Sequence, residues 1–261
     1  MCRLLAYLGP PIALADLVYG PEHSLEVQAY APREMSSGIL NADGFGLAWY
    51  DRARGDAPFV YRNVLPIWND ENLRSLAAYA RGSCILGYVR SATPGQRLDY
   101  ANCQPFVQDR IASVHNGFVA DFRASLRQKL RGRLTPEVED AILGSTDSEH
   151  LFAWLLHHLP AAVDLAAALR TSMGELADLA PGIEMTLNHV VSDGSQLVAS
   201  RMAHGSDAPS LYWLAGHDRF PDAVIVASEP LFDDPAWQLC PAESVIRVGE
   251  KLDVRIEPAR G

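Results

Sequence analysis

Cysteine is scarce in this sequence. The four cysteines, Cys2, Cys84, Cys103 and Cys240, lie far apart and form no CxxC pair. Structural zinc sites and disulfide-stapled folds use cysteines at closer, repeated spacings. The eight histidines likewise form no HExxH pattern, which is the spacing of a common catalytic zinc site. We therefore expect neither a metal site nor a disulfide framework.

Positive charge and long apolar runs are also lacking. The chain has 22 Lys and Arg against 32 Asp and Glu, a net charge of -10, and no basic run, which argues against binding of nucleic acid. The N-terminal apolar run is short and is broken by Pro10-Pro11, so it is not a signal peptide, and no stretch is long enough to span a membrane. We expect a cytoplasmic protein, because a reducing compartment would keep Cys2 a thiol.

Apolar residues are plentiful enough for a large core. Of the 261 residues, 48% are hydrophobic, and strand patterns lie near both ends with helical patterns between them. Because no linker or repeat is visible, we expect one α+β domain over residues 1–261. Strands or extended segments are expected at 3–8, 26–31, 47–50, 59–61, 84–89, 111–115, 185–192, 197–201, 211–214, 223–227, 245–248 and 252–256. Helices are expected at 14–19, from Asn69 to Ala80, and after Asp121, Thr146 and Pro160.

The start of the chain, Met1-Cys2, carries the first chemical signal. If Met1 is removed, Cys2 has both a thiol and a free α-amine. A thiolate is the reactive form of cysteine, and a model α-amine titrates near about 7.7–8.0, so it can accept a proton at neutral pH. Nucleophile and base would then share one residue, as in N-terminal nucleophiles. The apolar run that follows predicts a buried strand that would hold the terminus still; a chance cysteine is the alternative.

Three further stretches offer groups that suit acyl transfer. Arg90 ends a buried-strand pattern and needs a carboxylate partner, either internal or on a substrate. Asn116-Gly117 follows another strand, and because the next segment is helical, a hairpin turn is disfavoured; an amide side chain beside a glycine N–H can form an oxyanion hole. Asp147 lies in the first turn of a helix with a Thr146/Glu149 capping box, where it complements the helix dipole or holds an ammonium group.

These stretches together resemble a known family. The motifs that carry the resemblance occur in the order Cys2, Arg90-Ser91-Ala92-Thr93, His115-Asn116-Gly117 and Ser145-Thr146-Asp147-Ser148-Glu149. This set resembles the class II glutamine amidotransferases, which are N-terminal-nucleophile hydrolases. The resemblance implies a four-layer α-β-β-α sandwich with two stacked antiparallel sheets.

The resemblance also implies a role for each motif and no cofactor. Cys2 would attack a γ-glutamyl amide, and Asn116 with Gly117 would stabilise the oxyanion. Arg90 would bind the α-carboxylate of the glutamyl group, and Asp147 its α-ammonium. Other flanking residues would shape the pocket for this small-molecule substrate; they are Ser91, Thr93 and His115. For His115, a hydrogen-bonded core histidine is an equal alternative.

Five further stretches extend the resemblance over nearly the whole chain, to a subfamily of stand-alone proteins. These stretches are Pro21-Glu22-His23-Ser24-Leu25, Asn41 to Tyr50, Trp68-Asn69-Asp70, Asn102-Cys103-Gln104-Pro105-Phe106 and Ala227-Ser228-Glu229-Pro230-Leu231. The subfamily includes a hydrolase of ergothioneine biosynthesis that removes the γ-glutamyl group from γ-glutamyl-hercynylcysteine sulfoxide. The alternatives are a glutaminase subunit of a separate synthetase, a γ-glutamyl peptidase acting on glutathione-like molecules, and an inactive binding module. Because hercynyl groups carry a trimethylammonium, we hypothesise that Asp43 and Phe45, in the glycine-containing loop before Trp49-Tyr50, border the leaving group. For at least one of Trp49 and Tyr50 we expect a core position.

Overall fold

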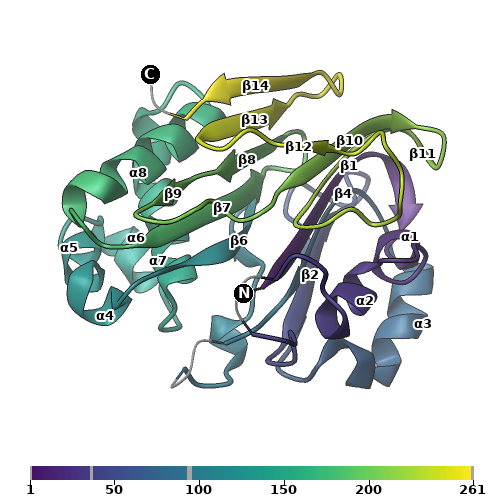
Figure 1. Cartoon of the computed structure of the whole chain (residues 1–261), viewed down its shortest axis with the longest axis horizontal. Coiled ribbons are helices and arrows are strands. Elements are labelled where there is room, and N and C mark those ends of the chain that lie inside the picture. Colours follow the sequence, from purple (N-terminus) through teal and green to yellow (C-terminus); the bar gives the residue numbers. More distant parts are fainter. Residues whose placement is uncertain (1, 36–37, 93–95, 260–261) are drawn as a thin grey trace.

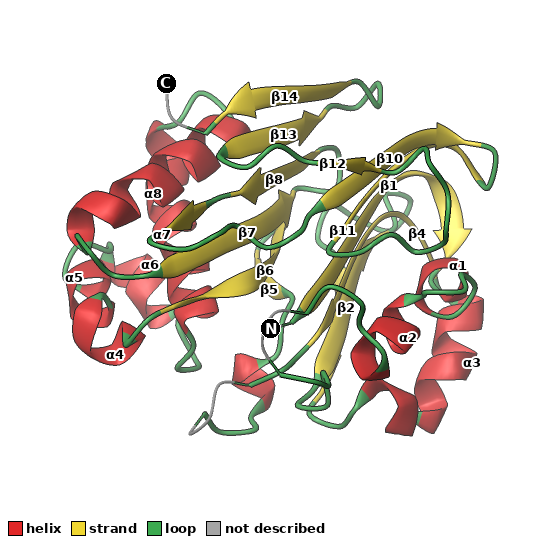
Figure 2. Ribbon diagram, in the orientation of Figure 1, coloured by secondary structure: helices red, strands yellow, loops and turns green. Residues whose placement is uncertain are grey.

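Two antiparallel β-sheets are stacked face to face, and helices cover the outer face of each (Figure 1; Figure 2). The structure, a computed structural model, describes residues 2–35, 38–92 and 96–259. The expected α+β class and the four-layer α-β-β-α sandwich of the N-terminal-nucleophile type are confirmed.

The first sheet combines strands from the N-terminal and the C-terminal parts of the chain. Its order is β12 (Gln238–Leu239), β10 (Tyr212–His217), β11 (Phe220–Ala227), β1 (Arg3–Ala13), β4 (Arg81–Val89), β2 (Phe45–Tyr50) and β3 (Phe59–Asn63). The second sheet has the order β14 (Val254–Pro258), β13 (Ser244–Val248), β8 (Leu197–Arg201), β7 (Met185–Ser192), β6 (Ile111–Val119) and β5 (Phe106–Gln108), and β9 (Ala203–His204) pairs with β7. The first strand of the chain is therefore central in its sheet.

Two groups of helices form the outer layers. The first sheet is covered by α1 (Ala15–Val18), α2 (Leu25–Tyr30) and α3 (Glu71–Tyr79). The second is covered by α4 (Phe122–Ser125), α5 (Arg127–Arg131), α6 (Pro136–Asp140), α7 (Asp147–His158) and α8 (Leu165–Leu179). Each group lies on the side of its sheet that faces away from the other sheet.

Alternation along the strands separates the cores. In β1, Leu5 and Tyr7 pack against the first group of helices, whereas Leu4 and Ala6 point between the sheets. Val114 of the second sheet faces the same inter-sheet layer. Successive side chains of a strand point to opposite faces, so Cys2 belongs to the inter-sheet layer as well.

One expected strand is a helix. Residues 26–31 were predicted to be strand or extended, but α2 runs over Leu25–Tyr30. The Ser24 Oγ accepts a hydrogen bond from the Val27 N–H and so caps the helix. Leu25 and Ala29, four residues apart, bury one helix face, which a loose alternation in sequence had concealed.

Helix caps also differ from expectation in detail. Asp70, and not Asn69, caps α3 by accepting from the Leu73 N–H. Asp121 precedes α4 in a left-handed conformation and makes no capping hydrogen bond. The predicted Thr146 cap of α7 is confirmed, but the Glu149 carboxylate accepts from the preceding loop instead of completing a capping box.

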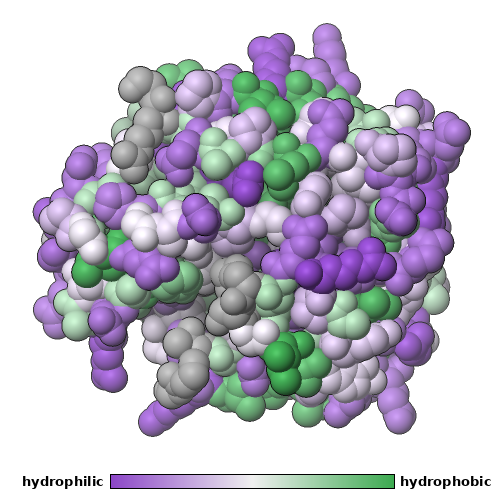
Figure 3. Space-filling model, viewed as in Figure 1, coloured by the Kyte–Doolittle hydropathy of each residue, from purple (hydrophilic) through white to green (hydrophobic). Residues whose placement is uncertain are grey.

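Hydrophilic residues cover much of the face seen in Figure 3, and apolar residues form separate groups there. Among the described residues, no helix combines the length and the apolar character needed to cross a membrane.

Candidate active site

Cys2 lies where the first sheet meets the segment after β4. The antiparallel register pairs Arg3 with Val89, which places Cys2 beside Arg90 and Ser91. The Ser91 N–H donates to the Cys2 Sγ at 3.3 Å, and the Sγ is 3.5 Å from the Ser91 carbonyl oxygen. Cys2 is 7% exposed, so the thiol is held at the edge of the inter-sheet layer. Met1 and Thr93 lie outside the described residues.

Tyr88 is a neighbour of the thiol that sequence reasoning did not single out. It points into the inter-sheet layer with Cys2 and is buried. Burial, followed by the charge of Cys2 and a hydrogen bond with it, raises the pKa of the Tyr88 phenol. The phenol therefore stays protonated and can donate to the sulfur. Alternation along β4 was the signal that could have placed it on this face.

Arg90 is buried without a carboxylate partner. It is 3% exposed, and its guanidinium lies 2.9 Å from Gln96 Oε1 and 3.4 and 3.5 Å from the backbone oxygens of Asp43 and Arg97. All three acceptors are neutral, and no acidic group of the described residues forms an ion pair with Arg90 within 4.0 Å. Buried charges are normally paired, so this arginine suits a ligand carboxylate.

Of the two residues expected at the leaving group, Asp43 bonds the segment after Arg90, and Phe45 points to the sheet face opposite Cys2. The Asp43 carboxylate accepts from the Ala92 N–H at 2.8 Å, and the Asp43 N–H donates to the Arg90 carbonyl. Asp43 thus supports the Arg90 segment. Phe45 is fully buried against Tyr61 on the helix side of the sheet. The structure therefore corrects the expectation that Phe45 contacts the leaving group, because its strand position turns it away from Cys2.

Trp49 and Tyr50 are both core residues, as expected for at least one of them. Trp49 packs against the helices of the first sheet, and Tyr50 faces the second sheet. The Tyr50 hydroxyl lies 2.9 and 3.0 Å from the backbone oxygens of Arg110 and Ser192, and its single proton can be donated to either of them. These two side chains therefore join layers of the sandwich.

Asn116 points into the inter-sheet layer opposite β1. Its Nδ2 donates to the Ser228 Oγ at 3.2 Å, and the same Oγ accepts from the Leu4 N–H at 3.0 Å. Because an amide nitrogen has two N–H groups, one is left for a further acceptor. Ser228 thereby ties Asn116 to the strand that carries Cys2.

Gly117 lies on β6 with its N–H at the strand edge. The N–H groups of His115 and Val119 on that strand donate to the side chains of Gln104 and Asp147. Successive N–H groups of a strand point to opposite edges, so the Gly117 N–H points to this same edge, between those two acceptors. No side chain fits here, since a Cβ on Gly117 would overlap Thr186 O.

His115 and Asp147 are linked through Ser148, which forms hydrogen bonds with both side chains. The His115 Nε2 lies 3.0 Å from Thr186 O, and its Nδ1 lies 2.9 Å from the Ser148 Oγ. Burial lowers the pKa of His115, against the opposing charge of Asp147 and the Thr186 carbonyl. The imidazole is therefore neutral and donates from Nε2, which favours a core histidine. Asp147 accepts from Val119 and from Ser148 N–H at 2.9 and 2.8 Å.

Glu229 organises the opposite flank and was not assigned a role from the sequence. Its carboxylate lies 3.1 Å from the buried Arg3 guanidinium and 2.7 Å from His23, and it accepts from the N–H groups of Arg33 and Glu34. Burial alone would raise the pKa of Glu229, but the hydrogen bonds from His23 and the backbone outweigh it and lower the pKa. The carboxylate thus stays ionised and anchors the start of β1.

Two stacked antiparallel sheets with Cys2 before a central strand define a fold of the N-terminal-nucleophile hydrolase type. A family model described as glutamine amidotransferases class-II matches residues 1–211. This chain therefore belongs to the class II glutamine amidotransferase family.

Individual relatives agree with that family. The chain is 34% identical to the γ-glutamyl-hercynylcysteine sulfoxide hydrolase of Mycobacterium tuberculosis (strain CDC 1551 / Oshkosh), with 96% of this chain and 94% of that protein covered. It is 30% identical to the probable glutamine amidotransferase DUG3 of Saccharomyces cerevisiae, with 99% and 84% covered. A solved glutamine aminotransferase class-II domain protein from Silicibacter pomeroyi matches the whole of both chains with a TM-score of 0.73 and 28% identity. These names agree with the expected enzyme class, an amidohydrolase.

Proposed function

We propose that this protein hydrolyses a γ-glutamyl amide with Cys2 as the nucleophile. The observation that carries the proposal is that the Cys2 thiol lies beside a buried arginine that has no carboxylate partner among the described residues. The Cys2 Sγ is 3.3 Å from the backbone nitrogen of Ser91, one residue after Arg90. A thiol beside a carboxylate-binding site matches the α-carboxylate and the side-chain amide of a γ-glutamyl group. Residues 1–261 act as one domain in this proposal.

The reaction proceeds through a thioester. After removal of Met1, the α-amine of Cys2 takes the thiol proton, directly or through a water, and the Sγ forms a bond to the γ-carbonyl carbon. The tetrahedral intermediate collapses as the C–N bond breaks, and the amine passes its proton to the leaving nitrogen. Water then adds to the thioester and displaces the thiol, so that glutamate and the free amine are the products.

Each flanking group has one task in this proposal. The second N–H of Asn116 Nδ2 and the Gly117 N–H donate to the oxyanion. Losing one such donor typically raises the activation free energy by about 2.7–4 kcal/mol. Arg90 binds the α-carboxylate, and Asp147 binds the α-ammonium. Ser91 holds the sulfur through its backbone.

For the substrate we propose γ-glutamyl-hercynylcysteine sulfoxide, as in the name of the mycobacterial relative. The 30% identity to a probable glutamine amidotransferase supports glutamine as a competing substrate. Glutathione-like peptides are the other competing substrates that the sequence leaves open. In hydrolysis the amine product diffuses away, so the enzyme needs no channel that passes ammonia to a second active site. We therefore favour hydrolysis over transfer.

The test combines intact mass with glutamate release. Purified protein is incubated with glutamine, glutathione and γ-glutamyl-hercynylcysteine sulfoxide, and we expect the active species to begin at Cys2 and to prefer the last substrate. Cys2→Ala should abolish turnover and keep the fold, whereas Cys240→Ala, which removes a buried thiol elsewhere, should keep turnover. Full activity with Met1 attached would exclude the amine as base, and preference for glutamine or glutathione would replace the substrate.

A further inference from the structure

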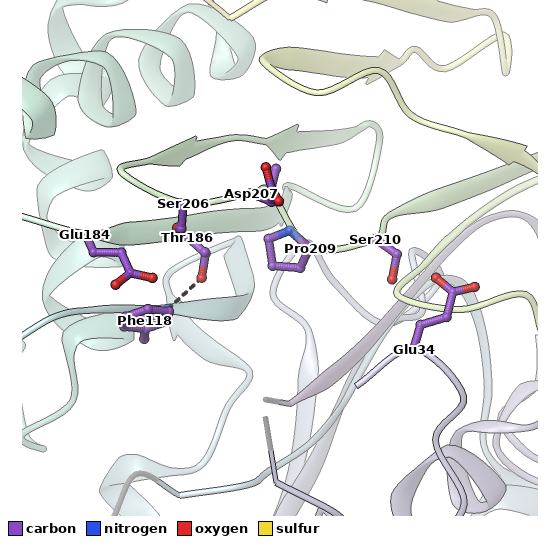
Figure 4. Close-up of a pocket in the computed structure, with 9 residues that line it drawn as sticks. Glu34, Phe118, Glu184, Thr186, Ser206, Asp207, Pro209 and Ser210 are labelled. Atoms are coloured by element: carbon purple, nitrogen blue, oxygen red, sulfur yellow. Dashed lines mark hydrogen bonds between the residues drawn. The ribbon is translucent and has the colours of Figure 1, made fainter. Parts of the chain in front are cut away.

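A cavity of about 390 Å³ borders Phe118 on β6 and Thr186 on β7, two residues along these strands from Asn116 and Asn188. Figure 4 shows the side chains of its lining, which come from β6, from β7 and the residue before it, from the loop between β9 and β10, and from the segment after α2. The lining residues are Glu34, Phe118, Glu184, Thr186, Ser206, Asp207, Ala208, Pro209 and Ser210.

The cavity is connected to the candidate active site by direct contacts. Phe118 follows Gly117 on β6 and lies opposite Thr186 of β7. The Ser210 Oγ donates to the carbonyl oxygen of Ser228, whose own Oγ bonds Asn116 and the strand after Cys2. The cavity is therefore linked to Asn116 and to the strand after Cys2 through Ser210 and Ser228.

The lining is acidic and contains one aromatic ring. Glu34, Glu184 and Asp207 supply three carboxylates, and the lining includes no Lys or Arg. The Glu184 and Asp207 carboxylates form no ion pair within the described ranges, and both residues are exposed. A cation is attracted by such carboxylates and by the face of an aromatic ring such as Phe118.

Two buried amide oxygens beside the cavity lack donors. Asn116 and Asn188 are directly opposite each other on β6 and β7, and both are 0% exposed. The Asn188 Nδ2 donates to the carbonyl oxygens of Pro209 and Ser210, two lining residues, at 3.1 Å each. Among the described residues neither Oδ1 has a hydrogen-bond partner. Because an unsatisfied buried acceptor is costly, these oxygens suit the N–H of a bound amide or amine.

We propose that this cavity receives the amine part of the substrate and selects leaving groups that carry a positive charge. The inference rests on the proposed function, since it assigns the leaving-group side of the same reaction. In this proposal Asn116 and Asn188, two residues along their strands from Phe118 and Thr186, would meet the amide, and Phe118 with the exposed carboxylates would meet the charge. The trimethylammonium of a hercynyl group is one cation of this class; it takes the place that the sequence had suggested for Asp43 and Phe45.

Two isosteric substrates test the charge preference. The γ-glutamyl amide of 4-(trimethylammonio)aniline is compared with that of 4-tert-butylaniline, which has the same shape without the charge. We expect the ratio of their kcat/KM values to favour the cation in the parent protein and to fall with added salt. Glu184→Gln or Asp207→Asn should lower the ratio about twofold to fivefold each, the range of exposed ion pairs. Phe118→Leu should lower it about twofold or more.

The control and a binding measurement separate this proposal from the proposed function. Glu137→Gln removes an exposed carboxylate from α6, away from the cavity, and should leave the ratio unchanged. Binding of benzyltrimethylammonium to the parent is measured by calorimetry and should weaken in the Glu184→Gln/Asp207→Asn double variant.

Each outcome has a defined meaning. The charge preference would be overturned if both anilides were hydrolysed with a kcat/KM ratio near one, or if every carboxylate variant left this ratio unchanged. The proposed hydrolase activity would stand in either case. Binding of the probe that depends on both carboxylates, without any turnover, would keep the cation site and overturn the hydrolase. Absence of both would overturn both.

Discussion

The two sides of the proposed binding site contrast in burial and in charge. On one side Arg90 is 3% exposed and its guanidinium faces three neutral oxygens. On the other side Glu184 and Asp207 are exposed and line an open, acidic cavity. One side presents a single buried cation, and the other presents several exposed anions.

This difference indicates how the two halves of a substrate would be recognised. Buried, hydrogen-bonded groups discriminate strongly, because a wrong ligand leaves them unpaired. Exposed carboxylates in water give weaker, salt-dependent attraction that tolerates varied shapes. In the proposed reaction the constant glutamyl group meets the buried side, and the variable amine meets the exposed side.

The largest effect is expected at Gly117, where the two sides meet. Gly117→Ala introduces a Cβ that overlaps Thr186 O, so β6 has to shift and the N–H leaves its position. We expect kcat/KM to fall on the order of 100-fold or more, the cost of one oxyanion donor. The free energy of unfolding should fall by about 1–3 kcal/mol. Kinetics and urea unfolding would measure the two effects.

Gly174→Ala is the matched control. Gly174 lies inside α8 with no atom within 4 Å of an added Cβ. Alanine there should raise the free energy of unfolding by about 0.5–1 kcal/mol and leave activity intact. Parent-like kcat in Gly117→Ala would remove Gly117 from the oxyanion site.

The next largest effect concerns the buried side. Arg90→Lys removes a two-pronged grip on a carboxylate, and Asp147→Asn removes the charge that pairs with an ammonium. We expect KM for γ-glutamyl substrates to rise about 10- to 100-fold, in line with hydrogen bonds to charged groups. The rise should be equal for cationic and neutral leaving groups.

Arg81→Lys provides the comparison for Arg90→Lys. Arg81 is exposed at the opposite end of β4 and donates to Pro11 O, so its replacement should leave KM unchanged. Glutamate binding, measured by calorimetry, should weaken in the Arg90 and Asp147 variants. Parent-like binding in both would mean that the glutamyl group is held by other residues.

The sequence predicted those features that depend on neighbouring residues. The strand after Cys2, the strand before Arg90 and the Thr146 cap are all local patterns, and the structure confirms them. The direction of Phe45 was missed because every residue of β2 is buried, so alternation of polar and apolar residues is absent from that strand.

Other features of the site depend on segments that only the fold brings together. Ser228 reaches Asn116 across 112 positions, and the cavity combines Glu34 with Glu184 and Asp207. Isolated acidic residues at such separations carry no local signal. The helix over residues 25–30 was missed for a different reason, since a short apolar pattern fits both periods until its buried face is known.

A smaller effect than at Gly117 or Arg90 is expected for Asp43→Asn, and this variant tests to which side of the binding site Asp43 belongs. The Asp43 carboxylate accepts from the Ala92 N–H at 2.8 Å, and an Asn side chain keeps one acceptor oxygen for that bond. We expect kcat/KM to fall about twofold to tenfold, the effect of weakening one hydrogen bond. Because Asp43 supports the Arg90 segment, the fall should be equal for the trimethylammonio and tert-butyl anilides, whereas Glu184→Gln should change their ratio. If Asp43→Asn lowered kcat/KM only for the cationic anilide, the cation would bind beside Asp43. The acidic cavity would then not be the cation site.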